Sequence, residues 1–255
     1  MRVVVLTGAG VSAESGLATF RDVGGAWSRV RLEDVATPEA YERDPARVHA
    51  FYDERRRQLA SVEPNAAHRA LAALERELSA RGGQLTLVTQ NVDDLHERGG
   101  SRRVIHMHGE LRRARCTGCG WVHEWDGDMA GDAGRPGGGA PCPQCAEPLR
   151  PHVVWFGEMP FALETIAAAI ARADLFVAIG TSGAVYPAAG YVDLARSLGV
   201  RTMEINAAPS DNADRFDERR YGAATTTVSD WVEALASSLA ASSSAPPKGS
   251  SPRDS

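Results

Sequence analysis

The fold is decided by Leu87-Val88-Thr89-Gln90-Asn91-Val92-Asp93-Asp94-Leu95-His96, which is followed a short way on by Ile105-His106-Met107-His108-Gly109. In each stretch an apolar run ends abruptly in side chains that carry amide, carboxylate or imidazole groups. Open α/β folds bind their ligands at the carboxyl edge of a parallel sheet, where strands end in this way. We therefore predict one pocket at this edge, with His108 as a base and with Asn91 and Asp93 beside it.

The composition is that of a globular protein. The chain has 255 residues, of which 43% are hydrophobic and 24% are charged, and these fractions are ordinary for a folded domain. A net charge of -5 argues against a sequence-specific nucleic-acid binder, which needs a basic face. No apolar run approaches the roughly 20 residues that cross a bilayer, and Met1 to Leu6 is too short for a signal peptide. We expect a cytoplasmic monomer with no membrane partner.

A candidate phosphate-binding turn lies at the N-terminus. Residues 3 to 7 predict a buried strand, and the next six residues, Gly8 to Ala13, fit the G-x-G-x-x-G/A pattern of a strand-to-helix turn. In such turns the glycines let the backbone approach a pyrophosphate, and the helix N-terminus offers free N–H groups. Short glycine-rich turns are common, however, and no strand precedes Glu33 and Asp34, where the acidic ribose-binding residue of a dehydrogenase would fall. The pattern therefore excludes an ordinary dehydrogenase.

Strand-like and helical patterns alternate along the rest of the chain. This alternation predicts an α/β fold, a Rossmann-like doubly wound parallel sheet. The expected strands include 85–89, 175–179 and 200–205, and the expected helices are 45–59, 65–80, 161–172, 187–198 and 228–240. Two further strand ends supply Gly180-Thr181-Ser182 and Asn206. The Ser-, Pro- and Ala-rich tail, residues 241–255, should be disordered.

The helix expected at 45–59 carries an arginine on its apolar face. The residues that share this face at i, i+3, i+4 spacing are Val48, Phe51, Tyr52, Arg55 and Leu59. Arg56 and Arg57 should point away from it. A guanidinium among apolar neighbours is costly unless an anion pairs with it. Two alternatives are open at this stage: an internal ion pair or an arginine that reaches out to solvent, and an anion that belongs to a substrate.

The cysteines form two C-x-x-C pairs, Cys116 with Cys119 and Cys142 with Cys145. In a reducing compartment this pattern predicts a metal site and not disulfides. Two such pairs bind one tetrahedral Zn²⁺ through four thiolates and leave no open position, so the ion should be structural. An iron site is the alternative. The glycine-rich interval from Gly127 to Gly139 should be a floppy excursion from this zinc ribbon.

Taken together, these motifs resemble those of the sirtuins, which are NAD-dependent protein-lysine deacylases. The resemblance covers about residues 3 to 235. The motifs that carry it, in chain order, are Gly8-Ala9-Gly10-Val11-Ser12-Ala13-Glu14-Ser15-Gly16, Thr19-Phe20-Arg21, Thr89-Gln90-Asn91-Val92-Asp93-Asp94-Leu95-His96, His108-Gly109, the paired C-x-x-C, Val153-Val154-Trp155-Phe156-Gly157-Glu158, Gly180-Thr181-Ser182 and Glu204-Ile205-Asn206.

The resemblance implies one catalytic domain, residues 1–240, with a smaller inserted module made of the zinc ribbon and a helical segment. The expected Rossmann-like parts are 1–22, 62–112 and 153–240. The small module comprises 23–61 and 113–152, with the zinc ribbon at 116–145.

The resemblance also implies which residues hold NAD, the co-substrate. They are expected along the sheet edge and in the loop after the first strand: Gly8, Ala9, Gly10, Ser12, Ala13, Glu14, Gly16, Thr19, Phe20, Arg21, Trp27, Gln90, Asn91, Val92, Asp93, Gly180, Thr181, Ser182, Asn206, Ala207, Ala208 and Ala224.

In the implied reaction, the carbonyl oxygen of an acyl-lysine attacks C1′ of the nicotinamide ribose, and nicotinamide leaves. His108 is the general base on the ribose hydroxyls, so that the 2′-oxygen attacks the resulting imidate and gives 2′-O-acyl-ADP-ribose. Asn91 and Asp93 order the ribose and the nicotinamide amide. A neutral histidine, with an ordinary pKa of about 6.5, suits base catalysis at neutral pH. We expect supporting structural roles for His96 and His106.

The spacing Tyr-x-x-Arg at Tyr52 and Arg55 resembles the sirtuin class that removes negatively charged acyl groups, including the bacterial general deacylases. There the phenol and guanidinium bind the distal carboxylate of succinyl- or malonyl-lysine. Ala36 fits the small residues that widen the tunnel in this class, whereas Leu32 stands where Ala is frequent and would narrow it. The other residues expected to bind the acyl-lysine protein or peptide are Val154, Trp155, Phe156 and Gly157.

Two rival functions share parts of this pattern. A zinc-ribbon module that binds nucleic acid and uses NAD as a signal would show salt-dependent DNA affinity without nicotinamide release, but the acidic balance of the chain argues against it. A mono-ADP-ribosyltransferase would yield ADP-ribosylated protein without O-acyl-ADP-ribose.

Overall fold

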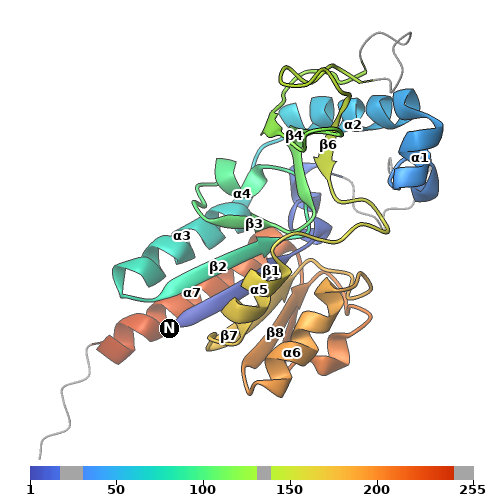
Figure 1. Cartoon of the computed structure of the whole chain (residues 1–255). Helices are drawn as coiled ribbons and strands as arrows, with labels where there is room; N and C mark the ends of the chain where they lie inside the picture. The colour runs from blue at the N-terminus through green and yellow to red at the C-terminus, as the bar shows by residue number, and fades with distance from the viewer. Residues whose placement is uncertain (18–30, 131–138, 244–255) are drawn as a thin grey trace, which may run out of the picture.

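The protein is built around a parallel sheet of six strands. The structure, a computed structural model, describes residues 1–17, 31–130 and 139–243. The strand order is β3-β2-β1-β7-β8-β9, and every neighbouring pair is parallel (Figure 1). The strands are β1 (Arg2–Thr7), β2 (Gln84–Thr89), β3 (Val104–His106), β7 (Leu175–Ile179), β8 (Arg201–Asn206) and β9 (Glu218–Tyr221). Numbered within this sheet alone, the order is 3-2-1-4-5-6, which confirms the doubly wound Rossmann-like arrangement.

Helices cover both faces of this sheet. Successive residues of β1 point to opposite faces because the side-chain period of a strand is two. Val3 and Val5 pack with α3 (Ala66–Ala80) and α7 (Ala224–Ser243) on one face, while Val4 and Leu6 pack with α5 (Leu163–Ile170) and α6 (Tyr191–Ser197) on the other. Both faces of the central strand are thus dry, which explains the unbroken apolar run at the start of the chain. Among the described residues, no helix is long and apolar enough to cross a membrane.

A second module joins two helices to a three-stranded antiparallel sheet and lies at the upper right in Figure 1. Its elements are α1 (Pro38–Arg43), α2 (Pro45–Ala60), β4 (Gly109–Cys116), β5 (Val122–Glu124) and β6 (Leu149–Val153). The domain boundary expected between residues 112 and 113 falls inside β4. The remaining short elements are α4 (Leu95–Arg98) and the 3-10 turns Ala9–Val11, Ala13–Ser15, Leu32–Asp34, Ala188–Gly190 and Ala213–Arg215.

The structure differs from the sequence-based predictions at both ends of the chain. The first turn does not open an α-helix: Ala9–Val11 and Ala13–Ser15 are two successive 3-10 helices. At the other end, α7 begins at Ala224 and continues through Ser243, so the first three residues of the expected disordered tail are helical. The rest of that tail lies outside the described residues.

A third correction concerns the face of α2 opposite the apolar stripe. Arg56 points away from that stripe but is not exposed: its guanidinium is buried against the Asp53 carboxylate and donates to the carbonyl oxygen of Gly127. The same carboxylate accepts hydrogen bonds from the backbone N–H groups of Met129 at 2.8 Å and Ala130 at 2.9 Å. Residues 127–130 are therefore fixed to α2, and the expected floppy excursion does not begin at Gly127.

Replacing Asp53 with Ala should destabilise the protein by about 3–5 kcal/mol, because it leaves a buried guanidinium and two N–H groups without their acceptor. Asp128→Ala is the matched control. Asp128 pairs with Arg57 across the same junction, but both side chains are more than half exposed, and exposed pairs contribute at most about 1 kcal/mol. Urea unfolding of both variants measures the difference, and equal losses would contradict the role given to Asp53.

Candidate active site at the sheet edge

The site begins where three central strands end at the same level. In the sheet register Thr7 lies beside Thr89 on one side and Ile179 on the other, so the turns that follow these strands meet. Gly10 and Gly180 are in direct backbone contact: a Cβ on Gly10 would lie 2.7 Å from the Cα of Gly180. Gly180 also has a positive φ of 63°. These glycines are thus required for the two turns to pack against each other, and not only for the approach of a ligand.

A cavity of about 760 Å³ opens at this edge and extends between the two modules. It brings together most of the residues expected to bind co-substrate and substrate. Those that line it are Gly8, Ala9, Gly10, Ser12, Ala13, Ala36, Tyr52, Arg55, Gln90, Asn91, Val92, Asp93, His108, Val154, Trp155, Phe156, Gly157, Gly180, Thr181, Ser182, Asn206, Ala207, Ala208 and Ala224.

Two expected site residues lie outside the lining of the cavity. The Glu14 carboxylate instead accepts hydrogen bonds from the backbone N–H and the hydroxyl of Thr225, both at 2.8 Å, and so joins the first turn to α7. Gly16, with a φ of 95°, ends the second 3-10 helix. Four other expected residues, Thr19, Phe20, Arg21 and Trp27, lie outside the described residues.

The cavity is also lined by residues whose place there was not predicted from the sequence. They are Leu17, Gln58, Leu59, Leu111, Val153, Glu158, Pro160, Val185, Tyr186 and Ile205, together with Leu32, which was expected only as a possible constriction. Gln58 and Leu59 could have been found, because they follow Arg55 by about one helical turn. The others lie in loops and at positions of β4, β6 and β8 that reach the cavity only through the packing of distant segments.

His106 and His108, which are separated by one residue, have partners that favour different protonation states. Nδ1 of His108 lies 3.1 Å from the carbonyl oxygen of Gln90. A carbonyl can only accept, so the His108 proton is on Nδ1 and the lone pair is on Nε2. Nε2 of His106 lies 2.7 Å from a carboxylate oxygen of Glu97, and its Nδ1 lies 3.4 Å from the carbonyl oxygen of Asn91. Both nitrogens of His106 therefore donate, as in an imidazolium.

The pKa values shift in the corresponding directions. Burial lowers the pKa of His108, and its hydrogen bond to Gln90 offsets only part of this. Burial acts in the same direction on His106, but the hydrogen bond and charge of Glu97 outweigh it and raise the pKa. These shifts favour the neutral form of His108, which lines the cavity, and the protonated form of His106 beside it.

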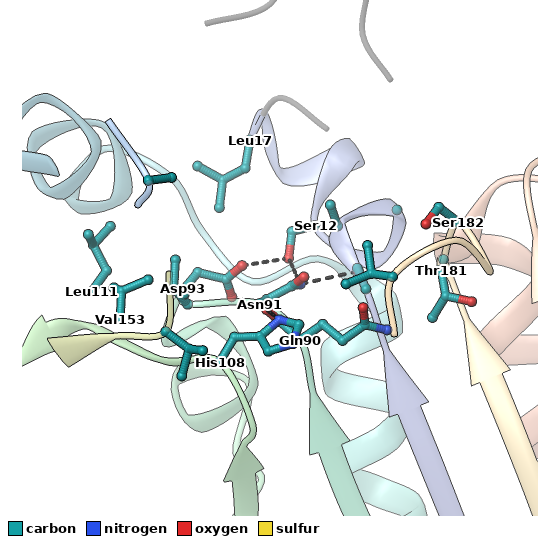
Figure 2. Close-up of a pocket in the computed structure, with 18 of the residues that line it drawn as sticks. Ser12, Leu17, Gln90, Asn91, Asp93, His108, Leu111, Val153, Thr181 and Ser182 are labelled. Atoms are coloured by element: carbon teal, nitrogen blue, oxygen red, sulfur yellow. Dashed lines mark hydrogen bonds between the residues drawn. The ribbon is translucent and has the colours of Figure 1, made fainter. Parts of the chain in front are cut away.

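Ser12 is the centre of a buried hydrogen-bond network that fixes Asp93 and Asn91 (Figure 2). Its hydroxyl donates to Asp93 at 3.0 Å and accepts from the Asn91 amide at 3.2 Å. Nδ1 of His68 accepts from the backbone N–H of Asn65 at 3.2 Å, so its Nε2 carries the proton and faces the Ser12 oxygen at 3.4 Å. The Ser12 oxygen accepts from both His68 and Asn91, so its own hydrogen is free to be donated to Asp93.

Asp93 keeps an acceptor function in this network. One carboxylate oxygen accepts from Ser12, and the other accepts from the backbone N–H of Leu95 at 3.2 Å. Burial raises the pKa of Asp93 to about 6, although both hydrogen bonds act to lower it. The carboxylate is therefore largely ionised at neutral pH and becomes protonated in mild acid.

The far end of the cavity is formed by α2 and the segment after β6. The buried hydroxyl of Tyr52 accepts a hydrogen bond from Nε1 of Trp155 at 3.0 Å. The Arg55 guanidinium stacks 3.8 Å above the ring of Phe51 and lies 3.4 Å from Glu54. Because the Glu54 side chain is 69% exposed, solvent screens this ion pair. Arg55 thus lies in the wall of the cavity, beside the solvent-screened carboxylate of Glu54.

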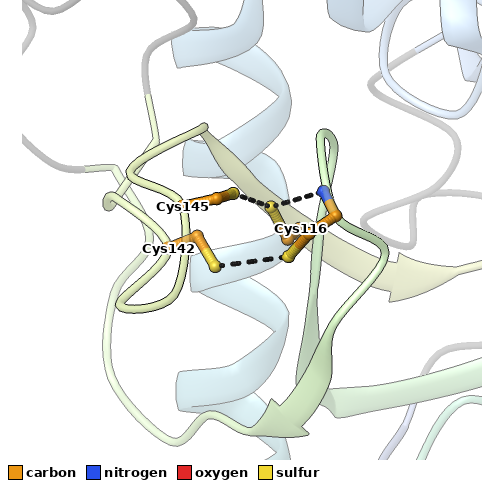
Figure 3. A group of neighbouring side chains, drawn as sticks. Cys116, Cys142 and Cys145 are labelled. Atoms are coloured by element: carbon orange, nitrogen blue, oxygen red, sulfur yellow. Dashed lines mark hydrogen bonds between the residues drawn. The ribbon is translucent and has the colours of Figure 1, made fainter.

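The four cysteines of the small module, at and after the end of β4 and ahead of β6, come together, and Figure 3 labels three of them. Their sulfur atoms all lie within 4.8 Å of one another, with Sγ–Sγ distances of 3.3 Å for Cys116 and Cys145 and 3.8 Å for Cys119 and Cys142. A tetrahedral zinc site with Zn–S bonds of about 2.3 Å requires sulfurs about 3.8 Å apart. The donor set fits one structural Zn²⁺, and the cluster is separate from the residues that line the cavity.

Comparisons with known proteins agree with this arrangement. The model of the Sir2 family matches residues 8–187. An NAD-dependent protein deacylase of Caulobacter vibrioides is 55% identical over 241 residues, which cover 94% of this chain and 98% of the relative. A solved Sir2 homologue bound to ADP-ribose has a TM-score of 0.85 and 40% identity, covering 94% of this chain and 93% of the other. A Sir2 homologue bound to NAD has a TM-score of 0.81 and 40% identity, covering 93% and 90%.

Cys142→Ala should remove the metal and lower the melting temperature, because the small sheet around the cysteines depends on the ion for its stability. Elemental analysis should give one zinc per chain for the wild type and almost none for the variant. Thr117→Ala is the control in the same loop, since its hydroxyl donates to the carbonyl of Pro148 and is not a metal ligand. A stable, zinc-free and active Cys142→Ala protein would refute a structural metal.

Proposed function

Because the chain belongs to the Sir2 family, we infer that it is an NAD-dependent protein-lysine deacylase that transfers the acyl group to ADP-ribose and releases nicotinamide. We propose further that it accepts acyl groups with a distal carboxylate, succinyl and malonyl, as well as acetyl. The main support for this reaction is the unprotonated Nε2 of His108. It lies in a cavity lined by turns at the ends of parallel strands, of the kind that bind dinucleotides.

In this proposal His108 takes the proton from a ribose hydroxyl of NAD. The hydrogen bond from its Nδ1 to Gln90 holds the ring in the tautomer that can accept at Nε2. The ionised Asp93 can accept from the nicotinamide amide, and the amide of Asn91, held by Gly8 and Ser12, can order the ribose. The turns at residues 8–13, 180–182 and 206–208 would hold the rest of the dinucleotide.

His108→Ala should abolish deacylation and the nicotinamide release coupled to it while leaving the fold intact, because it removes the base but no core contact. The loss should exceed 100-fold in kcat, the scale of general base catalysis. His123→Ala, on the small module, is the control. Turnover of the His108 variant within a few fold of the wild type would exclude it as the base.

The value of kcat/KM should fall in acid because His108 and Asp93 both act in their deprotonated forms. Burial places the pKa of His108 below its ordinary 6.5 and that of Asp93 at about 6. The value of kcat/KM should therefore hold its plateau at pH 7 and decline as the pH drops through about 6. In Asp93→Asn the remaining decline should reflect His108 alone. A wild-type midpoint above pH 7 would contradict this assignment.

The acidic-acyl preference rests on Arg55 and Tyr52. Arg55 lines the cavity beside Glu54, whose side chain is 69% exposed, so an anionic acyl group in the cavity would lie near its guanidinium. Burial raises the pKa of Tyr52, which keeps the phenol protonated and able to donate. Ala36 and Leu32 also line the cavity, and we expect the small Ala36 side chain to leave room for the acyl group and Leu32 to narrow the tunnel. Together, a guanidinium and a phenol match a carboxylate as charge-assisted donors.

We also propose that the protein is a cytoplasmic monomer. Support for the compartment comes from the four thiolates of the metal site, which require a reducing environment.

Arg55→Met should reduce kcat/KM for a succinyl-lysine peptide about 10- to 100-fold more than for the acetyl-lysine peptide, since a charge-assisted hydrogen bond contributes roughly 1.5–3 kcal/mol. Arg57→Met, on the same helix but 60% exposed and paired with Asp128, serves as the matched control. Equal losses on both peptides would reduce Arg55 to a structural residue.

A further inference from the structure

Trp155 links the acyl end of the cavity to a charged cluster that the deacylation reaction does not use. Its indole N–H donates to the Tyr52 hydroxyl at 3.0 Å, across 103 positions of sequence, and both side chains are buried. Indole can only donate, so the direction of this hydrogen bond is fixed: Tyr52 accepts with a lone pair.

This direction constrains the hydrogen of Tyr52. A phenol hydrogen lies near the plane of the ring and has two orientations, one on each side of the C–O bond. The indole N–H occupies one of these sides, so the Tyr52 hydrogen must take the other. The phenol, which lines the cavity, is thereby a donor of fixed direction before any ligand arrives. Orienting a donor in advance removes an entropy loss that binding would otherwise incur.

A clamp holds the indole in place for this contact. The Arg150 guanidinium lies 3.4 Å above the Trp155 ring, in cation–π geometry. Arg150 is in turn bound in a bidentate manner by Glu158, at 2.6 and 2.9 Å. The same carboxylate accepts the backbone N–H of Trp155 at 2.9 Å, and the ring of Tyr41 packs against the indole at 5.2 Å. Both the backbone and the ring of Trp155 are therefore fixed.

The clamp also removes an electrostatic obstacle. Glu158 lines the cavity, and a lone carboxylate there would repel an acidic acyl group. Its charge is matched by Arg150 and, at 3.4 Å, by Arg115. Two guanidinium groups against one carboxylate leave a net positive charge near the acyl end of the cavity, which favours an anion there.

We propose that Trp155 is a positioning residue for acidic-acyl specificity: its indole N–H, held by the Arg150–Glu158 clamp, turns the Tyr52 hydroxyl into a preset donor for the distal carboxylate of the substrate. This inference rests on the proposed acidic-acyl activity. It adds a residue that acts on selectivity through Tyr52 and needs no contact of its own with the carboxylate.

The test is a double-mutant cycle between Trp155→Phe and Tyr52→Phe. The quantity measured is the ratio of kcat/KM for succinyl-lysine to that for acetyl-lysine in one peptide. Trp155→Phe alone should lower this ratio about 3- to 10-fold, the effect of one oriented hydrogen bond, mainly by raising KM for the succinyl peptide. In the Tyr52→Phe background, Trp155→Phe should change the ratio less than twofold, because the hydroxyl it orients is gone.

Removing the indole can also destabilise the fold. The same cycle is therefore repeated with 3-benzothienylalanine in place of Trp155. This residue keeps the bicyclic shape and lacks the N–H donor. It should reproduce the loss of selectivity at an unaltered melting temperature.

Three results would overturn the proposal. If the isostere keeps the wild-type ratio, the N–H has no role. If the loss persists in the Tyr52→Phe background, Trp155 acts without Tyr52. If neither Tyr52→Phe nor Arg55→Met changes the ratio, the acidic-acyl function itself fails. This outcome can be told apart from failure of the Trp155 proposal alone, in which Tyr52→Phe still lowers the ratio.

Discussion

The site depends on one backbone constraint, the contact between the turns that follow β1 and β7. These strands end level with each other and with β2, and Gly10 and Gly180 allow the chain to pass where a Cβ would collide with backbone atoms. Because β2 ends beside β1, the carbonyl of Gly8 also accepts a hydrogen bond from the Asn91 amide. The polar groups of three separate segments are thereby brought to one edge of the sheet.

Around that edge, the protonation state of each histidine is set by whether its hydrogen-bond partner can donate or only accept. A carbonyl oxygen can only accept, so Gln90 fixes the tautomer of His108, and the backbone N–H of Asn65 fixes that of His68. The Glu97 carboxylate next to His106 favours its protonated form, whereas the partner of His108 is an uncharged backbone carbonyl, and burial lowers the His108 pKa. Two histidines separated by one residue thus differ in charge, and the neutral one lines the cavity.

How much of this could be predicted from the sequence depended on the range of the interactions. The strand ends at Asn91 and His108 were predictable because an apolar run that stops at polar groups is a local pattern. β9 was missed because Glu218-Arg219-Arg220-Tyr221 is an exposed edge strand with no apolar alternation. The burial of Arg56 and the bond between Trp155 and Tyr52 were not predictable, since their partners lie on remote segments that only the packing brings together.

The central claim, that His108 is a neutral base with its proton on Nδ1 while His106 is a cation, is tested most directly by ¹⁵N NMR of the histidine side chains at pH 7. The account predicts one protonated nitrogen on His108, Nδ1, and two on His106, with His108→Gln and His106→Gln variants to assign the signals. A proton on Nε2 of His108 at pH 7, in either the neutral tautomer or the imidazolium, would contradict it.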